Sequence, residues 1–162
     1  MSQDLPHLIW VDCEMTGLDI NKDALVEIAV LVTDAQLNVL GEGVDLVIKC
    51  EQSKLDAMDD FVKNMHTSSG LITEIPNGTT LAAADDAIII YLKKYAPSEG
   101  KSPLAGNSVY VDRAFIARDL PKLNAYLHYR TIDVSTIKEL DQHRRTATTP
   151  SCSASSKQRV GQ

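Results

Sequence analysis

The chain has 162 residues, of which 44% are hydrophobic and 23% are charged, so it has the composition of one folded domain and cannot be disordered throughout. Sixteen Lys and Arg against 22 Asp and Glu give a formal charge of -6, which argues against an extended surface that grips long nucleic acid. The three cysteines fit neither a disulfide framework nor a zinc site, and no apolar run is long enough to span a membrane, so we expect a cytoplasmic protein.

Three runs of β-forming residues open the chain. The first covers residues 8–11 and ends in Asp12-Cys13-Glu14, the second covers residues 25–32, and the third covers residues 39–50. The second and third runs are separated by a short connection, which is typical of neighbouring antiparallel strands in a hairpin or meander.

A helical pattern follows the three predicted strands. The pattern is broken over residues 54–75 and becomes regular after Thr80, which we expect to cap a helix that Pro97 ends. The order β-β-β-α-β-α-β-α predicts an α/β fold with helices against a mixed sheet. The later predicted elements are a strand at 104–105, a helix at 111–118, a strand at 129–134, and a helix from 137 that Ser135 or Thr136 caps.

The composition changes after Leu140. Residues 141–162 hold three Arg and one Lys against one Asp, a net charge of +3, together with seven Ser or Thr and no helical or strand period. We therefore predict an incomplete domain over residues 1–140 and a disordered, basic, Ser/Thr-rich tail over residues 141–162.

Two carboxylates stand at the end of the first predicted strand. Asp12 and Glu14 are two residues apart, so the pleat of a strand points both side chains to one face. A divalent cation such as Mg²⁺ would offset their mutual repulsion, since hard cations prefer carboxylate oxygens. From this pair alone, a solvated strand end is the competing interpretation.

Longer motifs are more specific than the pair of acids. The string of residues 9–19 resembles the first exonuclease motif of the oligoribonucleases, 3′-to-5′ exonucleases of the DEDD group with a ribonuclease H-like fold. The resemblance covers nearly all of residues 8–140. It continues through Glu27-Ile28-Ala29, Leu31-Val32-Thr33-Asp34, Met58-Asp59-Asp60, His66-Thr67, Ser69-Gly70-Leu71, Gly106-Asn107-Ser108, Asp112-Arg113, His128-Tyr129-Arg130 and Asp133-Val134-Ser135-Thr136.

The resemblance implies a metal site and a reaction. Asp12, Glu14 and Asp112 are implied as three of four acids that hold two Mg²⁺ or Mn²⁺ ions for hydrolysis of phosphodiester ends. Without the motif, Asp112 would be interpreted as an acid in the first turn of its helix.

The resemblance also implies substrate contacts and a homodimer that binds short oligoribonucleotides. Phe61 stands where the family normally has Trp, which keeps an aromatic surface for stacking. Taken alone, Leu18 and Phe61 would be assigned to the core, His66 to the surface or to a helix end, and Arg130 to a solvated charge. The implied substrate residues are Leu18, Phe61, His66, Ser108, Tyr129, Arg130, Ser135 and Thr136, with Tyr129 and Arg130 reaching from a second subunit to cap the far phosphate.

The last motif of the family is a His followed five residues later by the fourth Asp, on a C-terminal helix. Residues 141–162 contain no such pair, so we expect the final helix to be missing and the activity to be impaired. A frameshift and a natural truncation would both produce this pattern. A non-catalytic remnant that dimerises or binds oligonucleotides is an alternative, and a phosphatase of the haloacid dehalogenase class is a remote one.

Overall fold

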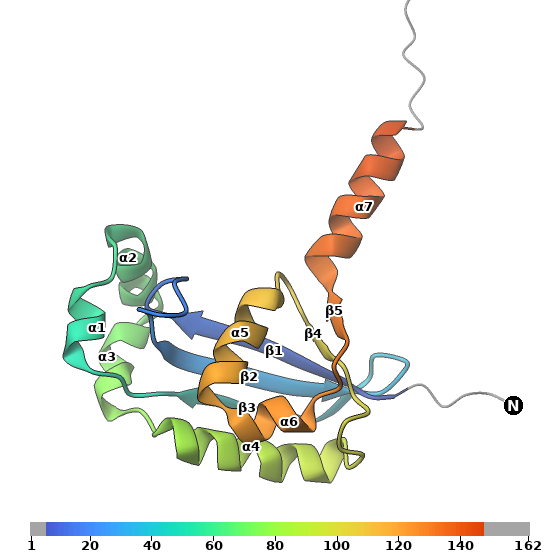
Figure 1. The fold of residues 1–162 in the computed structure, drawn as a ribbon, viewed down its shortest axis with the longest axis horizontal. Helices are drawn as coiled ribbons and strands as arrows, with labels where there is room; N and C mark the ends of the chain where they lie inside the picture. The colour runs from blue at the N-terminus through green and yellow to red at the C-terminus, as the bar shows by residue number, and fades with distance from the viewer. Residues whose placement is uncertain (1–5, 148–162) are drawn as a thin grey trace, which may run out of the picture.

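Five strands form one mixed sheet in the computed structural model, which describes residues 6–147 (Figure 1). The strands β1 (Leu8–Met15), β2 (Leu25–Thr33) and β3 (Val39–Val47) pair antiparallel in succession, and β4 (Leu104–Gly106) and β5 (Thr131–Asp133) extend the sheet in parallel from β1. The spatial order is β3-β2-β1-β4-β5. The α/β mixed sheet with its three-stranded meander is therefore confirmed. A haloacid dehalogenase fold is excluded, because an antiparallel hairpin follows β1 instead of a helical crossover.

The close packing of β4 on β1 depends on a glycine. A Cβ atom at Gly106 would lie 2.7 Å from the carbonyl oxygen of Val11. Because no side chain fits in that space, β4 can bring the residues that follow it close to the end of β1.

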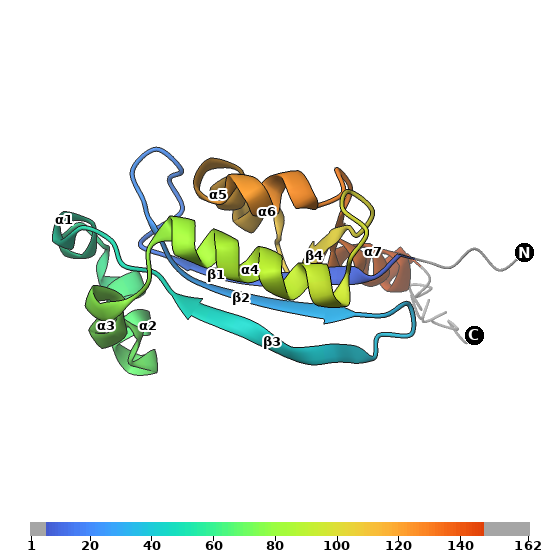
Figure 2. The ribbon, with the colours of Figure 1, turned by 90° about the horizontal axis from the view of Figure 1, so that it is seen from below.

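Three helices cover one face of the sheet (Figure 2). They are α4 (Leu81–Tyr95), α5 (Tyr110–Asp119) and α6 (Pro121–Tyr126). Their apolar residues pack on alternate residues of β1, which carries Ile9, Val11, Cys13 and Met15 on this face. Trp10, Asp12 and Glu14 consequently lie on the other face of the sheet.

The broken helical pattern is a run of short helices at one end of the sheet (Figure 1). These are α1 (Gln52–Asp56), α2 (Asp60–Ser69), α3 (Leu71–Glu74) and the 3-10 turn η1 (Ile75–Asn77). The Asp59 side chain caps α2, and Gly70, with a φ of 86°, separates α2 from α3. A second apolar cluster joins these helices to β2 through Val26, Leu55, Met58, Leu71 and Ile75.

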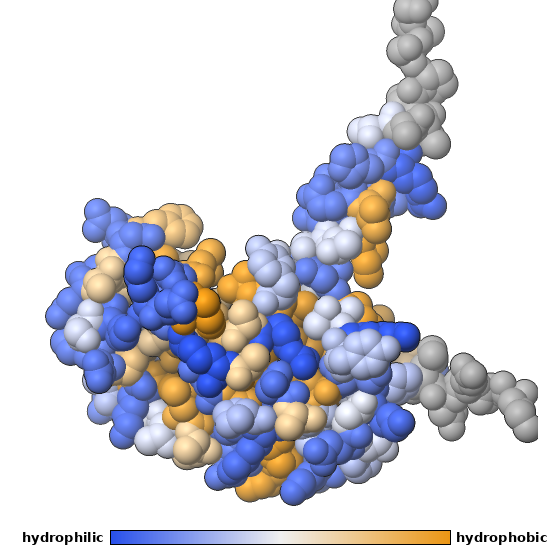
Figure 3. All heavy atoms as spheres, viewed as in Figure 1, coloured by the Kyte–Doolittle hydropathy of each residue, from blue (hydrophilic) through white to orange (hydrophobic). Residues whose placement is uncertain are grey.

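The last described helix, α7 (Val134–Ala147), projects away from the sheet (Figure 1). It continues through residues 141–147, where we expected disorder, and Asp141 pairs there with Arg144 and Arg145 at helical spacing. Residues 148–162 of the predicted tail lie outside the described residues, and the division at residue 140 stays a prediction. Apolar residues lie exposed along one side of the helix (Figure 3), among them Ile137 and Leu140.

The structure differs from the predicted helices in two details. The helix predicted over residues 111–118 ends before Pro121, as α5 does, but the short helix α6 that begins at Pro121 was not predicted. We also expected Ser135 or Thr136 to cap α7, whereas the Asp133 carboxylate accepts the Ser135 N–H at 2.9 Å. Within residues 6–147, no helix is long and apolar enough to cross a membrane.

Candidate active site

The two acids of β1 occupy the face of the sheet opposite the helices. Asp12 is exposed and Glu14 is partly buried, as the alternation of the strand requires. The predicted orientation of both carboxylates to one face is thus borne out by the strand geometry.

Asp112 joins these acids from α5. Its Oδ1 atom accepts the backbone N–H of Cys13 at 2.9 Å, across 99 residues of sequence. The residue is only 6% exposed. Burial raises the pKa of its carboxyl group, and the nearby charge of Asp12 raises it further. The hydrogen bond places Asp112 beside the peptide between Asp12 and Glu14, so the three acids form one group.

A buried histidine approaches the same group. His66, on α2, is 1% exposed, and its Nε2–H donates to the Met15 carbonyl at 2.9 Å. Its Nδ1 atom lies 3.9 Å from Oε2 of Glu14. The surface interpretation of His66 is therefore wrong, because its ring is buried against the end of β1. The helix-end interpretation agrees with the structure, since His66 lies in the last turn of α2.

The pKa of Glu14 is raised by burial, with further increments from Asp12 and Asp112, although the charge of His66 opposes the rise. One more acid lies next to it that the sequence analysis did not single out. Glu27 stands opposite Glu14 in the β1–β2 register, and burial, together with the charges of Asp45 and Glu14, raises its pKa as well. Only the pairing of the strands could reveal this neighbour.

The group offers carboxylate oxygens for a hard divalent cation. Within the described part of the chain, no three acidic, His or Cys side chains already stand in a metal-binding arrangement. The chemistry of the donors fits Mg²⁺ or Mn²⁺, since a cation near Glu14 and Asp112 would stabilise the charged form of two carboxylates whose pKa values are raised by burial and by the charge of Asp12. Asp12, Glu14 and Asp112 are the residues that could hold it.

A second polar group lies at the ends of β4 and β5. Asp133 is its centre: its Oδ1 atom accepts the Ser108 N–H at 3.0 Å and the Ser135 hydroxyl at 2.6 Å. The Ser108 and Ser135 hydroxyls are 3.4 Å apart, and Thr136 also donates its N–H to Asp133. These hydrogen bonds lower the pKa of Asp133. The structure thus joins Ser108, Ser135 and Thr136 through an acid whose role the sequence analysis missed.

Apolar and aromatic side chains stand out from the surface around these groups. Leu18 and Phe61 are 74% and 77% exposed, so their assignment to the core is wrong. Tyr129 is also exposed, and its ring lies 4.3 Å from that of His128 and 5.4 Å from the Arg130 guanidinium. No interaction links Tyr129 or Arg130 to the acids within residues 6–147 of this single chain.

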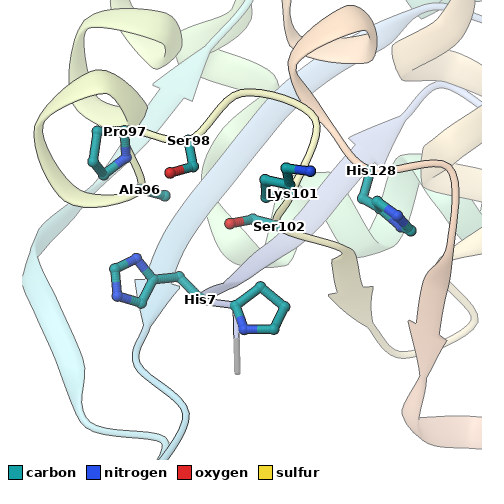
Figure 4. Close-up of a pocket in the computed structure, with 8 residues that line it drawn as sticks. His7, Ala96, Pro97, Ser98, Lys101, Ser102 and His128 are labelled. Atoms are coloured by element: carbon teal, nitrogen blue, oxygen red, sulfur yellow. The ribbon is translucent and has the colours of Figure 1, made fainter. Parts of the chain in front are cut away.

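A cavity of about 440 Å³ lies at the opposite end of β1, beside His7 (Figure 4). Lys101 points toward His128, whereas the Ser102 hydroxyl points toward His7 (Figure 4). The polar side chains that line the cavity do not point to a common place, and none of the acids lines it. The cavity is therefore separate from the candidate active site.

Comparison with known proteins agrees with this arrangement. A family model described as "Exonuclease" matches residues 9–158, which passes Leu140, where we expected the resemblance to end. A product-bound exonuclease I structure superposes with a TM-score of 0.65 at 18% identity, over 89% of this chain and 33% of that one. Exonuclease I of E. coli with a dT13 oligonucleotide gives a TM-score of 0.64 at 18% identity, over 88% and 31%. The family model and the fold together define a ribonuclease H-like exonuclease domain.

Similar sequences define the family more closely. Oligoribonucleases of Cutibacterium acnes and Streptomyces griseus are 59% and 53% identical over 133 and 134 residues, which are 82% and 83% of this chain. The oligoribonuclease of Rhodococcus jostii is 56% identical over 136 residues. The chain belongs to the oligoribonuclease family. It spans about two thirds of the length of these relatives, at 66%, 67% and 68%.

Proposed function

We propose that this domain is built to hydrolyse short oligoribonucleotides from the 3′ end. The observation that carries the proposal is the hydrogen bond from the Cys13 N–H to Asp112, which gathers Asp112 with Asp12 and Glu14. Three carboxylates at one place are costly without a cation, and a pair of divalent cations can stabilise both the attacking and the leaving oxygen in phosphodiester cleavage. The relatives named oligoribonuclease support the same substrate class.

Asp12, Glu14 and Asp112 would hold two Mg²⁺ or Mn²⁺ ions. When bound, such ions lower the pKa of the attacking water and stabilise the leaving oxygen. The protein itself fixes the donors: the Cys13 N–H orients Asp112, and the buried ring of His66 lies against Glu14. We infer that this fixed geometry limits the loss of side-chain entropy when a substrate arrives.

The exposed side chains would select the length of the substrate. Leu18 and Phe61 offer an apolar surface on which a terminal base can stack. Ser108 and His66 would lie near the scissile end of the substrate. Ser135 and Thr136 would cap the far phosphate, with Tyr129 and Arg130 contributed by the second subunit of a homodimer. An Arg fork suits this cap because it can bind a phosphate with two hydrogen bonds.

We further propose that activity is impaired in the chain as it stands. Residues 142–162 contain no Asp or Glu, so this segment supplies neither a fourth acid nor a His–Asp pair at a spacing of five. Loss of a general base typically lowers a rate by about 10²- to 10⁴-fold.

Incubation of the whole chain with a 5′-labelled RNA dinucleotide and Mn²⁺ tests both statements, with the oligoribonuclease of Cutibacterium acnes as the reference. We expect turnover that depends on Mn²⁺, is lost in Asp112→Asn, and is slower than that of the reference. Turnover equal to the reference would refute the impairment. If the dinucleotide neither binds nor is cleaved, the proposed function itself is refuted.

A non-catalytic, oligonucleotide-binding role is the second candidate. It is favoured by the exposure of Leu18 and Phe61, which provide a stacking surface that does not depend on the acids. Binding without hydrolysis at any Mn²⁺ concentration, weakened by Leu18→Ala, would select this role over the first.

A further inference from the structure

The loop between β1 and β2 (residues 16–24), hereafter the Leu18 loop, is organised by one carboxylate. The Asp23 side chain accepts the Asp19 N–H at 2.8 Å and the Thr16 hydroxyl at 3.2 Å. A Cβ atom at Gly17 would lie 2.5 Å from that carboxylate, so only glycine lets the loop close this tightly. These hydrogen bonds give the backbone at Leu18 an ordered conformation.

Arg118 of α5 holds the Leu18 loop from outside. Its guanidinium donates to the carbonyl oxygens of Ile20 and Asp23, the latter at 3.0 Å. The contacts join residues that are 98 and 95 positions apart in the sequence. Asp112 also lies on α5, so a single helix carries one of the acids and contacts the Leu18 loop.

The guanidinium is itself fixed by its neighbours. The Asp119 carboxylate accepts from Nε–H and Nη2–H, both at 2.7 Å, and the guanidinium lies 4.9 Å from the centre of the Phe115 ring. The planar guanidinium of an arginine can donate hydrogen bonds to two carbonyl oxygens and a carboxylate at once, which a lysine amine on a flexible side chain cannot do.

We propose that Arg118 is a positioning residue that clamps the Leu18 loop to α5 and thereby sets the place of Leu18 relative to Asp112. Only the consequence of the clamp, the placement of a terminal base relative to the acids, rests on the proposed function. As a mechanical device it can be tested without any nucleotide.

Trypsin cleavage after Lys22 measures the clamp directly. Lys22 lies exposed in the Leu18 loop, and the Lys54 amine of α1 also donates to its carbonyl oxygen. Loss of two charge-assisted hydrogen bonds in Arg118→Gln should raise the cleavage rate about tenfold. Arg118→Lys should restore part of the protection.

Lys122→Gln is the matched control, because Lys122 is an exposed cation of the neighbouring helix that pairs with Asp86 and does not touch the loop. We expect trypsin to cleave after Lys22 at the same rate in Lys122→Gln as in the unaltered chain. Should Arg118→Gln fail to fold, Asp119→Asn weakens the same fork while leaving the guanidinium in place. Unchanged cleavage in the folded Arg118 and Asp119 variants would overturn the clamp.

Binding of a fluorescent RNA dinucleotide in Ca²⁺ measures the consequence through a double-mutant cycle. We expect Arg118→Gln and Leu18→Ala each to raise Kd about tenfold. The double variant should bind no more weakly than Leu18→Ala, because Arg118 acts through Leu18.

The remaining outcomes separate the two claims. Additive effects, about a hundredfold in the double variant, would overturn the positioning role, as would faster cleavage with an unchanged Kd. Failure of the unaltered chain to bind the dinucleotide would refute the proposed function and the positioning role together, whatever the cleavage rates show about the clamp.

Discussion

Replacement of Asp112 separates its structural task from its chemical one. Asp112→Asn keeps an oxygen that can accept the Cys13 N–H, whereas Asp112→Ala leaves that buried donor without a partner. An unsatisfied buried N–H costs about 1–3 kcal/mol, and the better helix propensity of Ala returns about 0.5 kcal/mol. We therefore expect Asp112→Ala to be less stable than Asp112→Asn by about 0.5–2.5 kcal/mol.

The pH dependence gives the sign of the charge effect. Because the pKa of folded Asp112 is raised, its contribution to stability is present at low pH and is lost as the pH rises through the folded pKa. Asp112→Asn does not titrate there, so it should be more stable than the unaltered chain at neutral pH, and the difference should close on acidification.

Urea unfolding without metal, at pH values from about 3 to 7.5, measures both effects, since this range includes the ordinary pKa of an Asp carboxyl group. Mn²⁺ should raise the unfolding midpoint of the unaltered chain but not that of Asp112→Asn, as binding to the folded state alone stabilises it. Equal stability of the Ala and Asn variants would refute the role assigned to the Cys13 hydrogen bond. An equal Mn²⁺ response in the unaltered chain and the Asn variant would refute Asp112 as a ligand.

Three further outcomes are expected from single changes. Tyr91→Phe should cost about 1–3 kcal/mol in urea unfolding, because the buried hydroxyl accepts the Val32 N–H and donates to the Leu40 carbonyl; a change below 0.5 kcal/mol would contradict that bridge. Asp85→Ala should cost about 1–2 kcal/mol, since its carboxylate accepts the first N–H groups of α6, and Asp85→Asn should recover part of the loss in the same measurement. Since the pKa of Glu14 is raised, the affinity for Mn²⁺ should begin to decline on acidification at a higher pH than an ordinary carboxylate would give. Calorimetric titrations with Mn²⁺ should show a flatter dependence of affinity on pH in Glu14→Gln than in the unaltered chain. An identical dependence in both would exclude Glu14 as a ligand.

Local sequence patterns predicted the parts of the fold that depend on local physics. The apolar runs of β1 to β3 and the cap at Thr80 follow from alternation and capping, and the structure has them. The helix α6 was missed because its cap, Asp85, lies 37 residues away from Lys122, whose N–H it accepts. Proline is common both after the end of a helix and at the first position of one, and the carboxylate that accepts the first N–H groups of α6 is distant in sequence.

The candidate site divides in the same way. The strand period alone placed Asp12 and Glu14 on one face, but Asp112 needed the family motif, since nothing near it in sequence points to β1. The burial of His66 and the exposure of Phe61 did not follow from the local sequence, because α2 packs against the end of the sheet. This packing buries the polar side chain and leaves the aromatic one in solvent. Burial at such a border is set by tertiary packing, which a helical period does not contain.

The hydrogen bond from His66 to Met15 has a mechanical consequence. It ties the interior of α2 to the last residue of β1, one position beyond Glu14. Phe61 lies on the same helix, so we expect this hydrogen bond to limit how far the backbone at Phe61 moves relative to Glu14. In the proposed function, that constraint would hold the stacking surface in place before a base arrives.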